Sequence, residues 1–84
     1  MYYVYVLWAK EYQKFYIGYT ANIERRLAEH RNKKVYTTLR YKEPINIFYE
    51  AFISKEDAVR REQYFKTTKG RKALRLMLRN SIEN

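Results

Sequence analysis

The chain of 84 residues has a mass of 10.4 kDa, which is the size of one small domain and excludes a second hydrophobic core. Its 18 Lys and Arg against nine Asp and Glu give a net charge of +9, while 46% hydrophobic and 18% aromatic content exclude an intrinsically disordered chain. The absence of Cys and the single His exclude disulfide frameworks, thiolate metal sites and His-rich metal cages.

The first half of the chain predicts a hairpin followed by a helix. Residues 2–8 and 15–18 are rich in β-branched and aromatic residues and are separated by a short polar stretch, as expected for two paired strands. Both faces of the first strand are apolar, which favours packing on each side of it. Residues 22–32 then change to helical spacing, with Asn22 or Thr20 able to cap the first turn.

The second half predicts one strand and two helices. Residues 31–43 are expected to form a basic loop, and residues 45–53 alternate with the two-residue period of a strand. Ser54 is the expected cap of a helix that ends at Gly70. The apolar face of a last helix consists of Leu74, Met77 and Leu78. The predicted fold class is α+β, with a three-stranded, largely antiparallel sheet flanked by helices in the order β-β-α-β-α-α.

The net charge indicates the class of binding partner, and the first residues indicate the cellular location. Such a positive charge is typical of domains that bind a polyanion, with nucleic acid as the leading candidate. Residues 1–8 are apolar but lack a basic leader, and Lys10 and Glu11 cut the run short. They therefore predict neither a signal peptide nor a membrane span. We expect a cytoplasmic protein that binds DNA, with RNA as the alternative, and that does not bind membranes.

Three polar side chains occupy core-facing positions of the two longer predicted helices. On a helical wheel, His30 lies within the apolar arc of Ile23 and Leu27, and Arg26 lies at the edge of that arc. Glu62 lies at the centre of the buried stripe of the next helix. A carboxylate there costs several kcal/mol unless it pairs with a cation, takes a proton or holds a metal ion. The alternative interpretation is a structural salt bridge from Glu62 to Arg26 with an ordinary core histidine, but three coincident polar residues favour a site.

The tyrosines contain a second signal. Most of the ten are expected to pack as amphipathic rings around a small core. Tyr3 and Tyr5, however, share one face of the first strand, and Tyr16 shares a face with Gly18 on the second. Because Gly18 has no side chain, it permits close approach of backbone or ligand.

These residues resemble the paired tripeptides that name the GIY-YIG nuclease superfamily, here Tyr3-Val4-Tyr5 and Tyr16-Ile17-Gly18. The sequence is similar to the small single-domain members of that superfamily through residues 16–30 and again around Glu62. The resemblance covers about residues 2–72, and it implies one GIY-YIG-like domain over residues 1–84.

The resemblance implies phosphodiester cleavage with one divalent ion, Mg²⁺ or Mn²⁺. By this resemblance, Tyr5 and Tyr16 are the motif tyrosines and Arg26 is the helix arginine. His30 lies at the position that Tyr or His fills in the family, and Glu62 is the metal-binding glutamate. A single carboxylate suits an ion that keeps several waters, and Arg26 would neutralise charge on the phosphate. The general base stays open among Tyr16, Tyr5 and His30, in that order, because an unperturbed tyrosine with a pKa of about 10 is a poor base and histidine titrates near neutrality.

The sequence departs from the family pattern at three places. Tyr3 stands where the first motif has Gly, and Tyr19 stands where the excision-repair nuclease subunit has a lysine. Lys72 and Ala73 lie where many members have an asparagine. We expect no second DNA-binding domain of the kind that homing and repair members carry, and therefore weak sequence specificity.

Two basic clusters are candidates for the nucleic-acid interface. Residues 25–42 contain seven Lys or Arg, and residues 60–79 contain eight. Five phosphate contacts would already give a salt slope of about −4.5 on duplex DNA. The expected contacts are Tyr19, Arg25, Arg31, Lys33, Lys34, Lys66, Lys69, Arg71 and Lys72. The alternative is that these charges only keep the surface soluble and contact no nucleic acid. For the last helix, DNA contact and solubility alone are equally favoured.

The leading hypothesis is a divalent-metal-dependent DNA endonuclease that selects structure or damage with little sequence specificity, in DNA repair or recombination. The alternative is a non-catalytic nucleic-acid-binding module on the same scaffold, which the missing asparagine and lysine favour. Charge and aromatic content alone also fit a structural RNA-binding protein.

Overall fold

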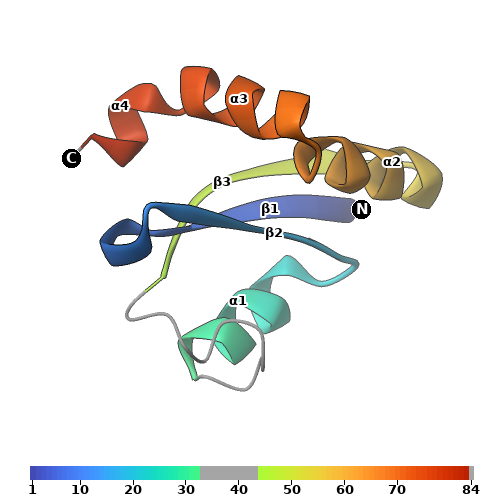
Figure 1. Ribbon diagram of the computed structural model, residues 1–84. Coiled ribbons are helices and arrows are strands. Elements are labelled where there is room, and N and C mark those ends of the chain that lie inside the picture. The colour runs from blue at the N-terminus through green and yellow to red at the C-terminus, as the bar shows by residue number, and fades with distance from the viewer. Residues whose placement is uncertain (33–43, 84) are drawn as a thin grey trace.

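The computed structural model describes residues 1–32 and 44–83 as an antiparallel sheet with helices on both faces (Figure 1). The strands are β1 (Tyr2–Ala9), β2 (Lys14–Thr20) and β3 (Ile45–Phe52), in the spatial order β2-β1-β3. The helices are α1 (Ile23–Arg31), α2 (Lys55–Phe65), α3 (Thr68–Met77) and the short α4 (Arg79–Ile82). A short 3-10 helix, η1 (Lys10–Tyr12), connects β1 to β2. The predicted α+β class and element order are confirmed, whereas η1 and α4 were not predicted.

The central strand β1 separates two different environments. It pairs antiparallel with β2 on one side and with β3 on the other. One of its faces packs under α2 and α3, which we call the core face, and the other faces α1, which we call the site face (Figure 1). Val4, Val6 and Trp8 belong to the core face. Because side chains alternate along a strand, Tyr3, Tyr5 and Leu7 point to the site face.

The core face holds the hydrophobic core. Its buried cluster contains side chains from β1, β2, α2 and α3, together with Leu78 just after α3. These residues are Val4, Val6, Trp8, Phe15, Ile17, Ala58, Phe65, Leu74 and Leu78. Ala58 and Phe65 come from the apolar stripe of α2 that the sequence predicted, and both are fully buried. The stripe therefore faces the sheet and fixes which side of α2 points toward solvent.

The boundary between α2 and α3 differs from the prediction. The helix that starts after Ser54 ends at Phe65 and does not continue to Gly70. Thr67 caps a new helix, because its side chain accepts a hydrogen bond from the backbone N–H of Gly70 at 3.0 Å. Gly70 lies in the first turn of α3, where a Cβ would collide with the carbonyl group of Tyr64. Glycine is thus needed for close helix packing and not as a helix terminator.

Two further expectations concern the chain's surface. Met77 was expected on the buried face of the last helix, but it is about half exposed, and Leu74 and Leu78 provide the buried contacts. The loop expected at 31–43 lies almost entirely outside the described residues. Within residues 1–32 and 44–83, no helix is long and apolar enough to cross a bilayer.

Candidate active site

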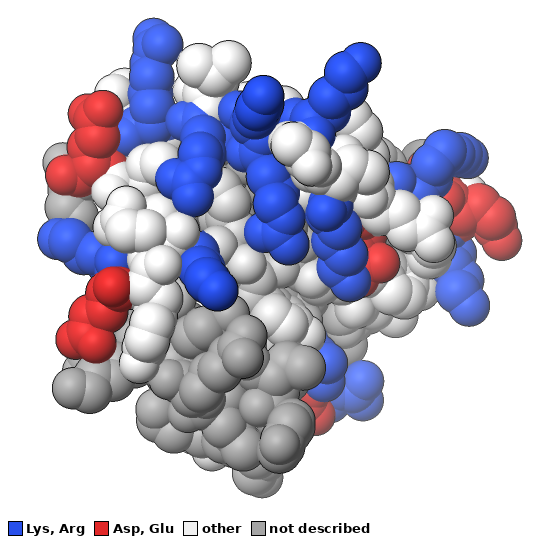
Figure 2. Space-filling model, in the orientation of Figure 1, with Lys and Arg blue, Asp and Glu red and all other residues white. Residues whose placement is uncertain are grey.

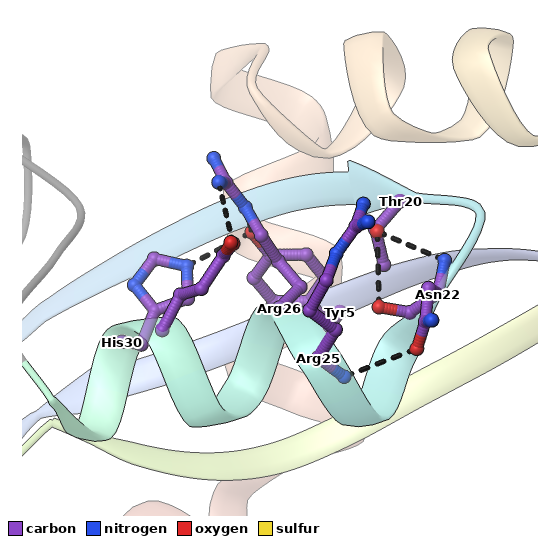
Figure 3. A network of polar contacts seen from close by, with 7 residues as sticks. Tyr5, Thr20, Asn22, Arg25, Arg26 and His30 are labelled. Carbon is purple, nitrogen blue, oxygen red and sulfur yellow. Dashed lines mark hydrogen bonds and ion pairs between the residues drawn. The ribbon is translucent and has the colours of Figure 1, made fainter.

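The site starts with the pairing of the two tyrosine motifs on adjacent strands. Tyr5 of β1 lies directly opposite Gly18 of β2. The ring of Tyr5 covers Gly18 so closely that a Cβ at position 18 would overlap its Cζ and hydroxyl. Tyr5 is 0% exposed. The glycine therefore lets the phenol lie flat across β2, with its hydroxyl directed toward α1 (Figure 3).

The position of α1 is set by residues at the end of β2. Asn22 is the N-cap, and its side-chain oxygen accepts a hydrogen bond from the backbone N–H of Arg25 at 3.0 Å. The Thr20 hydroxyl donates to the Asn22 carbonyl and accepts from the Asn22 N–H (Figure 3). These bonds fix the angle at which α1 leaves the sheet. Arg26 and His30, one helical turn apart, then both face Tyr5.

The three predicted residues Tyr5, Arg26 and His30 form one hydrogen-bonded network. Arg26 Nε donates to the Tyr5 hydroxyl at 3.2 Å, and the Tyr5 hydroxyl lies 2.9 Å from His30 Nε2 (Figure 3). Arg26 Nη1 donates to Glu29 Oε1 at 3.1 Å. The Tyr5 oxygen accepts from Arg26, so donation of the Tyr5 proton to Nε2 of His30 gives every group in the network a partner. That arrangement requires a neutral imidazole with its proton on Nδ1.

The electrostatics agree with this proton arrangement. Burial raises the pKa of Tyr5 to about 12, although the hydrogen bond from Arg26 opposes the shift. Burial and the nearby charge of Arg26 lower the pKa of His30 to about 4. The pKa of Arg26 is raised, first by its hydrogen bond to Tyr5. Near pH 7 the network therefore contains a neutral phenol, a neutral imidazole acceptor and one fixed positive charge.

Tyr16 completes the predicted cluster on the site face. It pairs with Leu7 in the sheet, so its side chain lies on the same face as Tyr5. Its ring centroid lies 5.1 Å from that of His30 and 6.4 Å from that of Tyr5. Tyr16 is only partly buried, whereas the hydroxyl of Tyr5 is enclosed by its two partners. Of the two motif tyrosines, Tyr16 is therefore the more accessible to an incoming molecule.

Glu62 lies on α2, in the helix layer on the core face, and its charge acts on Tyr5. Its side chain is 19% exposed, and Oε2 lies 3.3 Å from Nζ of Lys66 on the same helix. The expected alternative, a salt bridge from Glu62 to Arg26, is wrong because Arg26 pairs with Glu29 instead. The negative charge of Glu62 is one of the smaller contributions that raise the pKa of Tyr5. Among the described residues, no three acidic or His side chains converge as a ready-made metal cage.

The expected nucleic-acid contacts are distributed over several elements. Arg25 and Arg31 are exposed on α1, and Tyr19 is half-buried in a stacked pair with Tyr2, 6.4 Å between ring centroids. Lys66 is half exposed but paired with Glu62. On α3, Lys69, Arg71 and Lys72 are exposed. Lys33 and Lys34 lie outside the described residues. Figure 2 shows Lys and Arg crowded over the upper part of the molecule, where α2 and α3 lie in Figure 1.

Comparison with known proteins agrees with this geometry. The family model of the GIY-YIG catalytic domain matches residues 1–75. The chain belongs to the GIY-YIG family. UPF0213 proteins of Limosilactobacillus reuteri and Pediococcus acidilactici are 34% and 32% identical to it, over 98% and 96% of this chain and 88% and 85% of their own lengths. A UPF0213 protein of Bacillus halodurans, solved by NMR in solution, matches with a TM-score of 0.57 and 31% identity, covering 92% of this chain and 85% of that one.

Membership of the GIY-YIG family gives the paired tripeptides a structural meaning in this chain. Tyr3-Val4-Tyr5 and Tyr16-Ile17-Gly18 lie on neighbouring antiparallel strands, as the sequence resemblance implied. Sequence reasoning missed Glu29, which holds the second arm of the Arg26 guanidinium. Its position three residues after Arg26 on a helix was the available signal, because side chains at that spacing are neighbours.

Proposed function

We propose that this GIY-YIG domain is a divalent-metal-dependent endonuclease that cleaves phosphodiester bonds in DNA. The observation that supports the proposal most directly is the network in which a buried Tyr5 hydroxyl connects Arg26 to a neutral His30, with Tyr16 beside it. A network that holds one arginine in a fixed orientation at a partly open surface is suited to an anionic substrate. In this proposal the enzyme selects structure or damage with little sequence specificity and acts in DNA repair or recombination.

Arg26 is the proposed phosphate-binding and charge-neutralising residue. Its side chain is 35% exposed, so the guanidinium is held from within but open on one side. Nε is oriented by Tyr5 and Nη1 by Glu29. The planar fork thus keeps a fixed orientation toward the face where phosphate oxygens would lie. Tyr5 and Glu29 are positioning residues in this account, because they act through Arg26.

The donor set around Glu62 fits a single, largely hydrated ion. One partly buried carboxylate is enough for Mg²⁺ or Mn²⁺, which commonly keep several waters and take one or two carboxylates from the protein. Glu62 would hold the ion, and its present partner Lys66 is half exposed on a flexible side chain. When bound, such an ion polarises the phosphate and stabilises the leaving oxygen.

The general base is assigned by burial and hydrogen bonding. Tyr5 is fully buried, its oxygen accepts from Arg26, and its pKa is raised to about 12, so it is poorly suited to take a proton from a substrate water. Tyr16 lies on the same face with a partly exposed side chain. We therefore propose Tyr16, in its deprotonated form, as the group that takes the proton from the attacking water.

The outer surface of α3 is the proposed duplex-binding region. On α2 and at its C-cap, the cations Arg60, Arg61 and Lys66 are each paired with an acidic side chain. In contrast, residues Thr68–Met77 contain no acidic residue. The positive charge of α3 is thus available to phosphates, whereas that of α2 is largely neutralised.

The charge of α3 can be tested by a double reversal with a matched control. Arg71→Glu with Lys72→Glu lowers the net charge by four, as does Lys55→Glu with Arg60→Glu on α2. We expect the α3 variant to lose affinity for duplex DNA and about two units of salt slope, because roughly 0.9 is lost per phosphate contact. Equal losses in the two variants would show that only net charge matters.

Cleavage is tested with Mg²⁺ or Mn²⁺ on plasmid, flap and branched DNA. Glu62→Gln should reduce cleavage at least about 100-fold. Glu56→Gln, a change of an exposed carboxylate on the same helix, should leave the rate unchanged. Equal product from the wild type and Glu62→Gln would reject the proposed function. Salt-sensitive binding without metal-stimulated cleavage on any substrate would instead favour the non-catalytic binding module, in which Glu29 and Lys66 permanently pair with Arg26 and Glu62.

A further inference from the structure

The site face of the sheet continues past the network onto the edge strand β3. Tyr49 of β3 lies directly opposite Tyr5 of β1, so both side chains point to the site face. Tyr3, one pair further along, lies opposite Ala51. The rings of Tyr3 and Tyr49 meet edge to face, with 6.1 Å between centroids. We call this pair the aromatic shelf.

The aromatic shelf is not part of the core. Tyr49 is 56% exposed, although its neighbour Tyr5 in the same row is 0% exposed. The other aromatic pair at this end of the sheet, Tyr2 and Tyr19, stacks on the core face and packs against the hydrophobic cluster. One pair is therefore used for packing, while the other leaves a phenol ring open to solvent beside the proposed active site.

The chemistry of the surroundings favours an anionic aromatic ligand. The site-face positions of β1 and β3 around the shelf contain Tyr3, Tyr5, Leu7, Tyr49 and Ala51, none of them acidic. Arg26 lies on the same face, within a chain of net charge +9. Exposed tyrosines on a sheet surface next to cations are a common means of stacking nucleic-acid bases that are not paired.

We propose that the aromatic shelf stacks an unpaired base of the substrate next to the phosphate that is cut. The inference rests on the proposed function and names its substrate class: DNA with a single-stranded segment beside the cleavage point, as in a flap or an overhang. The Tyr5 ring reaches over β2, and neighbouring strands lie about 4.8 Å apart, so the shelf on β3 is roughly 10 Å from the network. Bases inside a duplex already stack on each other and cannot use such a surface.

The experiment measures binding without metal, in EDTA, so that no substrate is cut. Two DNA hairpins with the same duplex are compared, one blunt and one with a short single-stranded tail that contains 2-aminopurine. We expect the wild type to prefer the tailed hairpin and to quench the 2-aminopurine fluorescence. Tyr49→Leu should weaken binding of the tailed hairpin about 5- to 100-fold and abolish the quenching, with less than about a twofold change for the blunt hairpin.

Three variants control for folding and for general aromatic loss. Tyr49→Phe keeps the ring and should bind the tailed hairpin like the wild type. Tyr3→Leu removes the ring that supports Tyr49 and should weaken tailed binding by a smaller factor. Tyr12→Leu removes an exposed tyrosine of η1, outside the site face, and should leave both affinities unchanged.

Several results would overturn the inference. Equal wild-type affinity for tailed and blunt hairpins is one, and equal losses on both hairpins in Tyr49→Leu is another. A dimer that Tyr49→Leu converts to a monomer, measured by light scattering, would assign the shelf to contact between two copies instead. Glu62→Gln separates this inference from the proposed function: it should bind the tailed hairpin normally while losing cleavage, so that either claim can fail without the other.

Discussion

The two faces of one sheet divide the work of this small domain. The core face of β1 presents Val4, Val6 and Trp8, which pack under α2 and α3 and are nearly inaccessible to solvent. The site face of the same strand presents Tyr3 and Tyr5, and Tyr5 is buried only together with hydrogen-bonding partners. A chain of 84 residues has room for one apolar core, so a buried polar network must be placed on the opposite face. Stability should therefore depend mainly on the core face, and catalysis mainly on the site face together with Glu62 of α2.

The largest expected effect is on stability, at the centre of the core face. Phe65 is fully buried between α2 and the sheet, so Phe65→Ala should lower the free energy of unfolding by about 3–5 kcal/mol. Urea denaturation followed by circular dichroism measures the change. A loss below about 1 kcal/mol would show that the helix layer contributes little to stability and that the core face is not the main source of it.

On the site face, the main expected loss is in cleavage. Arg26→Lys keeps the charge but cannot hold Tyr5 and Glu29 with one planar group. Cleavage in Mg²⁺ should fall about 100- to 1,000-fold, whereas the unfolding free energy should fall by only about 1 kcal/mol. The same assays on Arg60→Lys, an exposed arginine of α2, provide the control. Unchanged cleavage by Arg26→Lys would contradict the role of the guanidinium fork.

The buried histidine makes the stability of the site face depend on pH. The pKa of His30 is about 4 in the folded protein, against about 6.5 in the unfolded chain, so the unfolded state takes up its proton first as the pH falls. The contribution of neutral His30 to the free energy of unfolding is fully present above about pH 6.5. It is lost progressively as the pH falls toward 4, by up to about 3 kcal/mol in all. Urea unfolding of the wild type and His30→Gln at pH 7, 5.5 and 4.5 tests this. If the variant shows the same pH dependence as the wild type, His30 is not the group responsible.

The contact between the two motifs links stability to the geometry of the site. Gly18→Ala adds a methyl group where the Tyr5 ring lies, which should cost about 1–3 kcal/mol and move the Tyr5 hydroxyl away from Arg26. Cleavage should then fall more than the stability change alone explains, when it is measured at a temperature where the variant is fully folded. Full activity in a folded Gly18→Ala would mean that the close approach of Tyr5 to Gly18 is dispensable.

Local patterns in the sequence determined much of this protein. The β-branched and aromatic residues of 2–8 predicted β1, and the cap signals at Asn22 and Ser54 predicted the starts of α1 and α2. The turn-by-turn spacing of Arg26 and His30 placed both on one helix face. These signals lie within a few residues of each other and depend on local backbone geometry, so they can be recognised without knowing how the elements pack. They were sufficient for the fold class and for the residues that gather around Tyr5.

Only the tertiary structure decided which partners these residues have. The alternative interpretation paired Glu62 with Arg26, but in the folded protein Arg26 pairs with Glu29 and Glu62 pairs with Lys66. The break after Phe65 depends on Gly70 meeting the backbone of Tyr64. The shelf of Tyr3 and Tyr49 joins strands that are far apart in the sequence, and their register follows from the pairing of β1 with β3. Such contacts depend on how whole elements pack, which residue spacing along the chain does not encode.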